Sequence, residues 1–310
     1  MSGMSFVPLS ALELRDAVRN SKSYDPLRLD RILRVEEDQG LVEVQASSTW
    51  KALGARLRPS DVRAASARTT MPTVGESIAR NAAGPDGRTA VTHVESLTLV
   101  TPDGELRRVS RYSNPRLFSL AVGGQGLFGA CYSITLRVDS LARALEEAAP
   151  GETLQPASGG ARGRTLHLLV PPERLDLCMA QLRAHCAEWR SPIESVELRR
   201  IREESETYLR WASRDYAEIR VRLARPGSLA ASVRATQLAR ELLDVAIAHG
   251  GSFPIACTPE ATRSQVEACY PQLKSFLAEK RQADPFERLA NPWYRHFQRM
   301  FKRNAREPAR

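Results

Sequence analysis

Residues whose types suit phosphate binding gather in two short segments of this 310-residue chain. The first segment runs from Thr73 to Gly84 and the second from Gly123 to Gly129. Glycine lets backbone N–H groups approach a phosphate closely, because no Cβ stands in the way. Between the two segments, Pro102-Asp103-Gly104 is typical of a tight turn and predicts a hairpin. The sequence therefore predicts a phosphate cradle built from the two segments that flank this hairpin.

The second segment contains a G-x-G-x-x-G pattern, Gly124-Gln125-Gly126-Leu127-Phe128-Gly129, which is typical of nicotinamide dinucleotide sites. That pattern needs a strand before it and a helix that begins within it, so that the helix N-terminus can hold the pyrophosphate. Here residues 130–138 follow, and their β-branched residues in rough alternation predict a strand instead. The context therefore excludes a Rossmann fold.

The elements around these segments predict an α+β chain with mostly antiparallel pairing. In the first half we expect helices over 10–19 and after the capping residue Thr49, and strands over 41–46, 97–100, 105–109 and 130–138. In the second half we expect strands over 165–170, 195–200, 216–224 and 252–257, and helices over 171–190, 228–249, 262–270 and 272–283. We divide the chain into a domain over 1–140, a linker or mobile loop over 141–164, a second domain over 165–283 and a tail over 284–310.

Composition limits the classes of protein. The net charge of +9 comes mostly from arginine, which predicts a solvated arginine-rich surface and is compatible with peripheral contact with an anionic membrane face. No nucleic-acid-binding module accompanies the charge. No apolar run is long enough to span a membrane, and no signal-peptide pattern opens the chain. The five cysteines lack metal-ligand spacing, as do the five histidines, so we expect free thiols, no metal and a cytoplasmic protein of unknown oligomeric state.

Several short motifs are spread along the chain: Thr73-Val74-Gly75 with Ser77-Ile78-Ala79, His93-Val94-Glu95-Ser96-Leu97, Asn114-Pro115, Gly123 to Gly129, Asp284-Pro285 and Trp293-Tyr294-Arg295-His296. Together they resemble the vanillyl-alcohol oxidase-like family of FAD-linked oxidoreductases, with its PCMH-type FAD-binding domain, and in particular the branch that includes decaprenylphosphoryl-ribose oxidase. The resemblance implies an FAD-binding domain, then an α+β cap domain with a mostly antiparallel sheet that covers the substrate, and a tail that packs back on the flavin domain.

The resemblance also implies which residues contact the cofactor. They are Ser23, Tyr24, Thr73, Val74, Gly75, Ser77, Ile78, Asn81, Gly84, Gly124, Gly126, Gly129 and Cys131. Ala83 stands where this branch commonly has a histidine for covalent flavin attachment, so the FAD would be bound non-covalently.

The chain departs from the family pattern at several of these places, and it looks shortened and partly degenerate. The first flavin loop is shortened near Ser23-Tyr24, and Glu76 stands where the second glycine of the usual Val-Gly-Gly is found. A carboxylate beside a diphosphate costs on the order of 1 kcal/mol. The expected strand over 252–257 corresponds to a family strand that carries tyrosine or lysine towards the substrate, and it has Pro254 and Cys257 at those places.

Catalytic residues are therefore not assigned by the resemblance, and Tyr294, His296 and Cys257 are the candidates that the sequence offers. Histidine and tyrosine can move protons, and a thiolate can act as a nucleophile. His93 is expected to be a structural core residue, and His167 and His185 lack carboxylates at ligand spacing.

Two functions remain open. The first is an FAD-dependent oxidoreductase that oxidises an alcohol carbon of a sugar- or lipid-like small molecule. The second is a degenerate, flavin-free homologue that serves as a non-catalytic subunit or scaffold for a protein partner. A weaker third interpretation is an arginine-rich module that binds an anionic ligand in the flavin groove.

Overall fold

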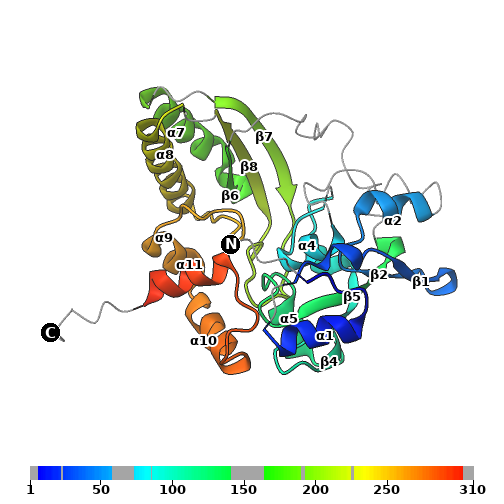
Figure 1. The fold of residues 1–310 in the computed structure, drawn as a ribbon. Helices are drawn as coiled ribbons and strands as arrows, with labels where there is room; N and C mark the ends of the chain where they lie inside the picture. The colour runs from blue at the N-terminus through cyan, green and yellow to red at the C-terminus, as the bar shows by residue number, and fades with distance from the viewer. Residues whose placement is uncertain are drawn as a thin grey trace.

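The computed structural model describes residues 6–21, 24–57, 73–84, 86–140, 164–189, 193–224 and 227–302, which form two packed units (Figure 1). The N-terminal unit has a five-stranded sheet in the order β1-β2-β5-β3-β4, and the C-terminal unit has a three-stranded sheet in the order β6-β8-β7. Both sheets are antiparallel in the part of the chain described. The mixed helical and antiparallel content expected from the sequence is confirmed.

The predicted elements of the N-terminal unit occur in their expected order, whereas the strand over 32–36 and the helices over 74–79 and 115–121 were not predicted. Its helices and strands are α1 (Ala11–Arg19), β1 (Ile32–Glu36), β2 (Leu41–Gln45), α2 (Trp50–Arg56), α4 (Val74–Ala79), β3 (Val94–Val100), β4 (Leu106–Ser110), α5 (Pro115–Ala121) and β5 (Ala130–Arg137). Single 3-10 turns lie at Pro26–Arg28, Glu37–Gln39 and Ala90–His93.

The hairpin between β3 and β4 shows why this order forms. The Asp103 carboxylate accepts a hydrogen bond from Thr101 Oγ1 at 2.6 Å and from the Glu105 backbone N–H at 3.1 Å. Gly104 follows with φ of +81°, a conformation that side chains with a Cβ rarely adopt. The turn fixes the register of β3 against β4, so that the glycine segments on either side of the hairpin return to the same end of the sheet.

Apolar residues at alternate positions build the core of this unit. Val42, Val44, Leu97 and Ile134 belong to one buried cluster between the sheet and its helices. A second buried cluster joins α1 to the sheet through Leu14, Val18, Leu29, Val100, Ala130 and Leu289. Burial of these side chains stabilises the sheet by the usual transfer of apolar surface out of water.

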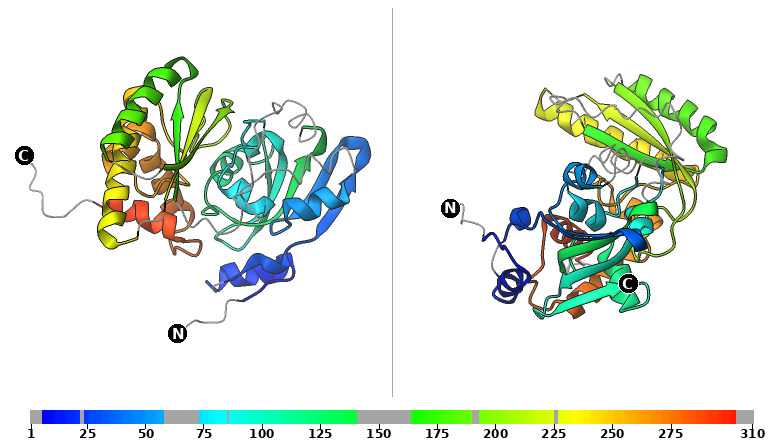
Figure 2. Two further views of the ribbon diagram at one scale, coloured as in Figure 1. Left: turned by 90° about the horizontal axis from the view of Figure 1, so that it is seen from above. Right: turned by 90° about the vertical axis from the view of Figure 1, so that its right-hand side faces the viewer.

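The C-terminal unit consists of β6 (Arg164–Val170), a 3-10 turn (Pro172–Arg174), α7 (Leu175–Glu188), β7 (Ile193–Ile201), β8 (Tyr216–Leu223), α8 (Leu229–Ala248), α9 (Arg263–Cys269), α10 (Leu273–Ala283) and α11 (Pro292–Phe301). Helices α7 and α8 pack on one face of the sheet, and the other face is turned towards the N-terminal unit (Figure 2). The predicted linker over 141–164 lies outside the described residues except for Arg164, where β6 begins.

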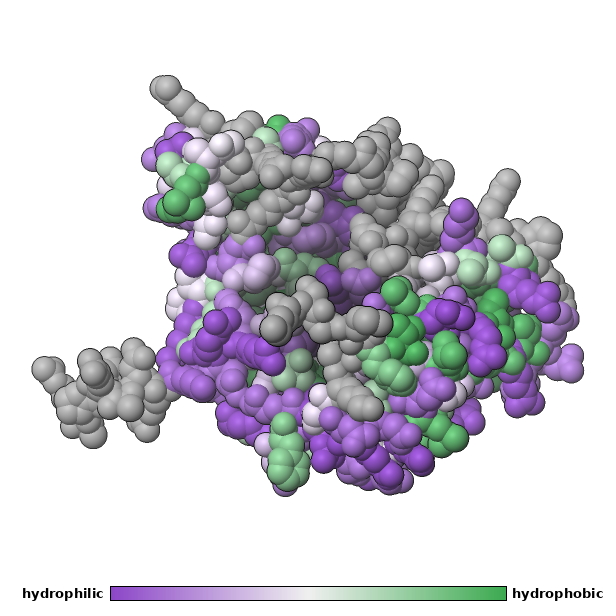
Figure 3. Space-filling model, viewed as in Figure 1, coloured by the Kyte–Doolittle hydropathy of each residue, from purple (hydrophilic) through white to green (hydrophobic). Residues whose placement is uncertain are grey.

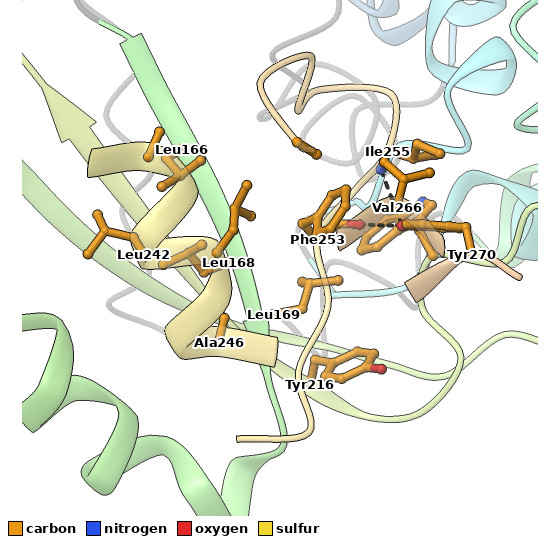
Figure 4. Packing of buried hydrophobic residues seen from close by; sticks show 14 of the residues in the cluster. Leu166, Leu168, Leu169, Tyr216, Leu242, Ala246, Phe253, Ile255, Val266 and Tyr270 are labelled. Atoms are coloured by element: carbon orange, nitrogen blue, oxygen red, sulfur yellow. Dashed lines mark hydrogen bonds between the residues drawn. The ribbon is translucent and has the colours of Figure 1, made fainter. Parts of the chain in front are cut away.

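Side chains alternate between these two faces. Leu166 and Leu168 of β6 pack with Leu242 of α8, whereas Leu169 points to the opposite side, towards Phe253 (Figure 4). The Tyr270 hydroxyl in the same cluster donates to the Phe253 carbonyl and accepts from the Ile255 N–H at 3.2 Å. The sheet therefore presents one apolar face to its helices and a second face of different character to the rest of the molecule.

The predicted strand over 252–257 is wrong. Ser252 forms one isolated antiparallel bridge with Leu169, and the chain then turns, with the Cys257 N–H donating to the Pro254 carbonyl at 3.0 Å. Proline has no N–H to donate to a ladder, so Pro254 ends the pairing after a single bridge.

Direct contacts join the two units. Trp211 Nε1 donates to the Asn81 carbonyl at 3.0 Å, and the Tyr208 N–H donates to the Ser119 carbonyl at 2.9 Å. In the tail, Arg288 Nη1 donates to the Pro102 carbonyl at 2.7 Å. Phe297 of α11 packs in the core of the C-terminal unit, so the tail touches both units up to residue 302, beyond which residues are not described.

The surface seen in Figure 3 is mostly hydrophilic, with some apolar side chains gathered over the N-terminal unit. Exposed apolar residues of that unit include Leu27, Leu33 and Val35. Within the described residues, no helix is long and apolar enough to cross a membrane.

Candidate functional site

A cavity of about 280 Å³ lies between α4 and the five-stranded sheet. This volume is close to the lower end of the roughly 300–1,000 Å³ found for small-molecule pockets. Leu97, Leu99 and Ala130 give it apolar walls, and Tyr24, Ser47 and Thr73 add hydroxyl groups. An aromatic or ribosyl group of a nucleoside suits such a lining.

The cavity collects many of the residues that the sequence pointed to. Those that line it are Tyr24, Thr73, Gly75, Ile78, Gly126, Gly129 and Cys131. They come from both glycine segments, from β5 (Cys131) and from the N-terminal region (Tyr24). Ser23 lies outside the described residues.

The remaining predicted cofactor residues do not line the cavity and have partners within the protein itself. Val74 is fully buried in the core, and Ser77 Oγ accepts from Trp50 Nε1 at 2.9 Å. The Gly84 N–H donates to the Arg88 carbonyl at 2.7 Å. Gly124 lies in the turn after α5, with its N–H donating to the Ala121 carbonyl at 3.1 Å.

The first N–H groups of α4, which the sequence predicted to face a diphosphate, all have partners within the chain. The Val74 N–H donates to the Ser48 carbonyl at 2.9 Å, and the Gly75 N–H donates to the Ala46 carbonyl at 2.8 Å. Thr73 caps the helix by accepting from the Glu76 N–H at 3.1 Å through its hydroxyl and from the Ser77 N–H at 3.2 Å through its carbonyl. These amides are therefore occupied, since each N–H is a single donor.

The glycines of the site differ in how close a Cβ added to each of them would lie to neighbouring atoms. A Cβ on Gly75 would lie 2.6 Å from the Ala46 oxygen, and one on Gly124 would lie 1.9 Å from the Leu120 oxygen. At Gly129 the nearest atom would be Leu99 Cβ at 2.9 Å. These three glycines are required by the packing of the chain itself. Gly126 is different, because it has φ of +72° and open space where its Cβ would be, so the cavity stays open at this position.

Asn81 joins the two units rather than the cavity. It is fully buried in the left-handed conformation, with φ of +48°. Its Oδ1 accepts from the Val91 N–H at 2.9 Å, and its Nδ2 donates to Glu204 Oε1 at 3.3 Å. Both ends of the side-chain amide therefore have protein partners.

Two ionisable groups in the cavity are neutral at physiological pH. Burial raises the pKa of Tyr24 to about 12, with a smaller contribution from Cys131. Burial also raises the pKa of Cys131 to about 12. A hydroxyl and a thiol in these states do not repel an anionic ligand.

Glu76 brings one carboxylate to the cavity wall, and its charge is paired. Glu76 Oε1 lies 2.9 Å from Arg80 Nη2 in a partly exposed ion pair. Arg80 also lies close enough to Cys257 to affect the pKa of its thiol. Burial raises the pKa of Cys257, although the Arg80 charge opposes this, so Cys257 is a thiol rather than a reactive thiolate.

The other two catalytic candidates lie on α11. Tyr294 is fully buried, its hydroxyl donates to Glu287 Oε1 at 3.3 Å, and burial together with Glu287 raises its pKa. Burial and the nearby Arg299 lower the pKa of His296, whose Nε2 is buried without a hydrogen-bond partner. Neither residue lines the cavity.

A charged cluster that was not predicted from the sequence lies on the face of the sheet that is turned towards the N-terminal unit. His167 Nδ1 lies 2.8 Å from Glu218 Oε1, and Glu218 Oε2 accepts from Arg199 Nε and from Arg220 Nε. Burial alone would raise the pKa of Glu218, but Arg199 and the His167 hydrogen bond outweigh it and hold this pKa below its usual value. The alternation of Glu218, Arg220 and Arg222 along β8 was the signal that could have revealed a polar face.

Comparison with protein families gives one match. Residues 23–110 match the FAD binding domain family, which is of the PCMH type, and a comparison with curated proteins found no match. The matched range includes Tyr24 and the segment from Thr73 to Gly84, while Gly126, Gly129 and Cys131 of the cavity lie beyond it. Among the residues described, no three or more metal-ligating side chains come together. The chain thus contains an FAD-binding domain, which suggests a flavin-dependent oxidoreductase.

Proposed function

We propose that this protein is a flavin-dependent oxidoreductase that binds FAD non-covalently, with the adenosine end of the cofactor in the cavity beside α4. One observation carries the proposal: residues of the family match and both glycine segments line the same cavity. Its size and apolar walls suit one end of a dinucleotide, and Gly126 leaves it open. Since alanine has no nucleophile, covalent attachment at Ala83 is not available.

The residues of the cavity suit the nucleoside end of the cofactor better than its diphosphate. Hydroxyl groups of Tyr24, Ser47 and Thr73 can bond to a ribose or a base, and the neutral Tyr24 and Cys131 tolerate a negatively charged ligand. The α4 amides are already used within the chain, so they do not contribute to binding of the diphosphate. Affinity for FAD then comes mainly from the nucleoside end.

The substrate in this proposal is a small molecule with an alcohol carbon, of a sugar- or lipid-like class. When bound, FAD would supply the acceptor for the hydride of that carbon, and a side chain of the protein would have to accept the hydroxyl proton. His167 suits this role, because the buried Glu218 carboxylate holds its Nδ1 and leaves Nε2 for the substrate. The resemblance of the sequence motifs to the decaprenylphosphoryl-ribose oxidase branch favours an alcohol substrate without identifying it.

A second function, a flavin-free homologue that serves as a subunit for a protein partner, is favoured by a different observation. The α4 amides are all occupied, and Glu76 places a carboxylate on the cavity wall. Both features oppose binding of a diphosphate at this helix.

Visible absorption of the purified full-length chain, before and after incubation with excess FAD and desalting, separates the two functions. The oxidoreductase retains a flavin absorption band, whereas a protein that stays colourless contradicts it and supports the flavin-free homologue. The variant Ala121→Leu fills the cavity from α5 and should abolish retention, because Ala121 lines it. Ala184→Leu, the same change at an exposed position of α7, is the matched control and should retain flavin like the wild type.

A further inference from the structure

The inward face of the three-stranded sheet carries charged side chains in register. His167 of β6 lies opposite Arg220 of β8, and Glu197 of β7 lies opposite Arg220 on the other side. Arg199 of β7 lies opposite Glu218 of β8 in the same way. Directly paired residues in an antiparallel sheet hold their Cβ atoms about 5 Å apart, so these side chains form one cluster.

Two carboxylates, Glu218 and Glu197, face the two guanidinium groups of this cluster, but only Glu218 lies within bonding distance of them. Glu218 is 1% exposed and accepts from Arg199 Nε and, at 3.2 Å, from Arg220 Nε. Two guanidinium groups, with side chains 8% and 11% exposed, thus share one buried carboxylate. Glu197 acts on Arg220 only at longer range, so part of the charge of Arg220 has no close partner, which favours binding of a further anion.

Arg220 has hydrogen-bond donors left for such an anion. Arg199 directs Nη1 to the carbonyl oxygens of Ala83 and Gly84 at 3.4 Å, which fixes it against the N-terminal unit. Among the described residues, Arg220 bonds to the protein through Nε alone, and its two Nη groups have no hydrogen-bond acceptor. A guanidinium presents its Nη donors in a planar fork that matches a carboxylate or a phosphate.

The cluster lies next to the candidate cofactor cavity. Glu76 on the cavity wall pairs with Arg80, and Arg80 lies close to Cys257, which lies near Glu218 and Arg220. Arg199 bonds to residues 83 and 84, directly after the first glycine segment. A molecule held by Arg220 would therefore lie between the sheet and the FAD-binding domain.

We propose that Arg220 binds an oxyanion, a carboxylate or a phosphate, of a small-molecule ligand in this space. That this ligand is the substrate rests on the proposed oxidoreductase function. The new point is that the substrate carries an anionic group. The register between His167 and Arg220 places the anionic group one side chain away from the imidazole. A hydroxyl close to the oxyanion of the substrate would then reach His167.

Binding of simple oxyanions to the full chain without added FAD tests this inference. Inorganic phosphate and acetate are titrated separately by calorimetry, with chloride holding the ionic strength constant. We expect saturable binding of at least one oxyanion and a loss of about tenfold or more in affinity in Arg220→Gln, since a hydrogen bond to a charged group contributes that much. If phosphate binds more tightly than acetate, the anionic group of the substrate is a phosphate, and if acetate binds more tightly, it is a carboxylate.

Arg222→Gln is the matched control, because Arg222 lies two residues further along β8 and loses the same charge. Equal losses in both variants, or no saturable binding in the wild type, would overturn the inference. If Arg220→Gln does not fold, Arg220→Lys keeps the charge without the fork, and unchanged oxyanion affinity in that variant contradicts the inference. FAD retention measured on the same preparations reports on the proposed function separately, because neither anion titration requires the cofactor.

Discussion

His167 Nδ1 lies 2.8 Å from Oε1 of Glu218, and this pairs an imidazole of β6 with a buried carboxylate of β8. The same carboxylate bonds to Arg199 and Arg220 from two strands. Glu218 therefore holds three side chains in place on the face of the sheet that is turned towards the FAD-binding domain. Its removal should affect both the stability of the sheet and the ligand that the sheet can bind.

We expect Glu218→Gln to lower the free energy of unfolding by about 3 kcal/mol, because two buried guanidinium groups lose the carboxylate that bonds to them. Urea unfolding followed by circular dichroism measures this change. Glu197→Gln is the matched control on β7, since Glu197 only faces Arg220 at longer range, and it should cost less than about 1 kcal/mol. Equal losses in the two variants would show that Glu218 is not the centre of the cluster.

Asn81 should contribute more to stability than its conformation alone explains. Asn81 and Asn114 both have a left-handed backbone, with φ of +48° and +53°, but Asn114 is exposed and makes no capping bond with its side chain. Asn81→Ala loses the bonds to Val91 and Glu204 at the junction of the units, and we expect a loss of about 3 kcal/mol in the free energy of unfolding.

Asn114→Ala should lower the free energy of unfolding by about 1 kcal/mol, which is the cost of placing alanine in the left-handed conformation without the loss of a side-chain hydrogen bond. Thermal and urea unfolding of the two variants should therefore differ by roughly 2 kcal/mol. A difference near zero would mean that the amide of Asn81 does not hold the units together.

Local signals accounted for most of the elements, because helix caps, turns and alternation act within a few residues. Ser10, Thr49, Ser228 and Thr262 all cap helices where the sequence indicated. The expected strand after Gly251 failed for an equally local reason, since Pro254 cannot extend a ladder. Such sequence patterns predict structure reliably because the residues of the pattern themselves make or prevent the local hydrogen bonds.

The site was harder to predict, because it depends on contacts between distant residues. Thr73 and Gly75 were found from their types, but the use of the α4 amides depends on Ala46 and Ser48, which belong to the end of β2 and the turn after it. His167 and Glu218 are 51 positions apart, and only the register of β6 against β8 brings them together. No spacing rule within the sequence contains that register.

Stability should fall as the pH is lowered from about 6.5 to about 4, because of His93. Burial, with Arg88 and Arg137, lowers the pKa of His93 to about 4, and Nδ1 lies 2.8 Å from Ser140 Oγ. A lowered histidine pKa means that the unfolded chain binds the proton more readily, so folding is most favourable above the unfolded pKa of about 6.5 and loses this contribution as the pH falls to 4.

Urea unfolding at pH 7 and pH 5 tests the role of His93. His93→Gln removes the titrating group, so its loss of stability between the two pH values should be smaller than that of the wild type by on the order of 1–2 kcal/mol. His249→Gln is the control, since His249 lies at the exposed end of α8 and bonds to Gln181 at 3.0 Å. The same pH dependence in wild type and His93→Gln would exclude His93 as its source.

Glu76→Gln should strengthen FAD binding several-fold, if the cavity beside α4 is the cofactor site. Glu76 places a carboxylate on the cavity wall, and its pair with Arg80 is partly exposed, so the charge is only partly compensated. Removal of a like charge near the diphosphate is expected to favour binding by about 1 kcal/mol. Fluorescence titration with FAD measures the dissociation constant of each variant.

Glu279→Gln is the matched control, because Glu279 pairs with Arg116 on the surface, with 2.6 Å between Glu279 Oε1 and Arg116 Nη2. This substitution should leave the affinity for FAD unchanged. An equal affinity in wild type, Glu76→Gln and Glu279→Gln would place the diphosphate elsewhere, and no measurable binding in any of them would support the flavin-free function.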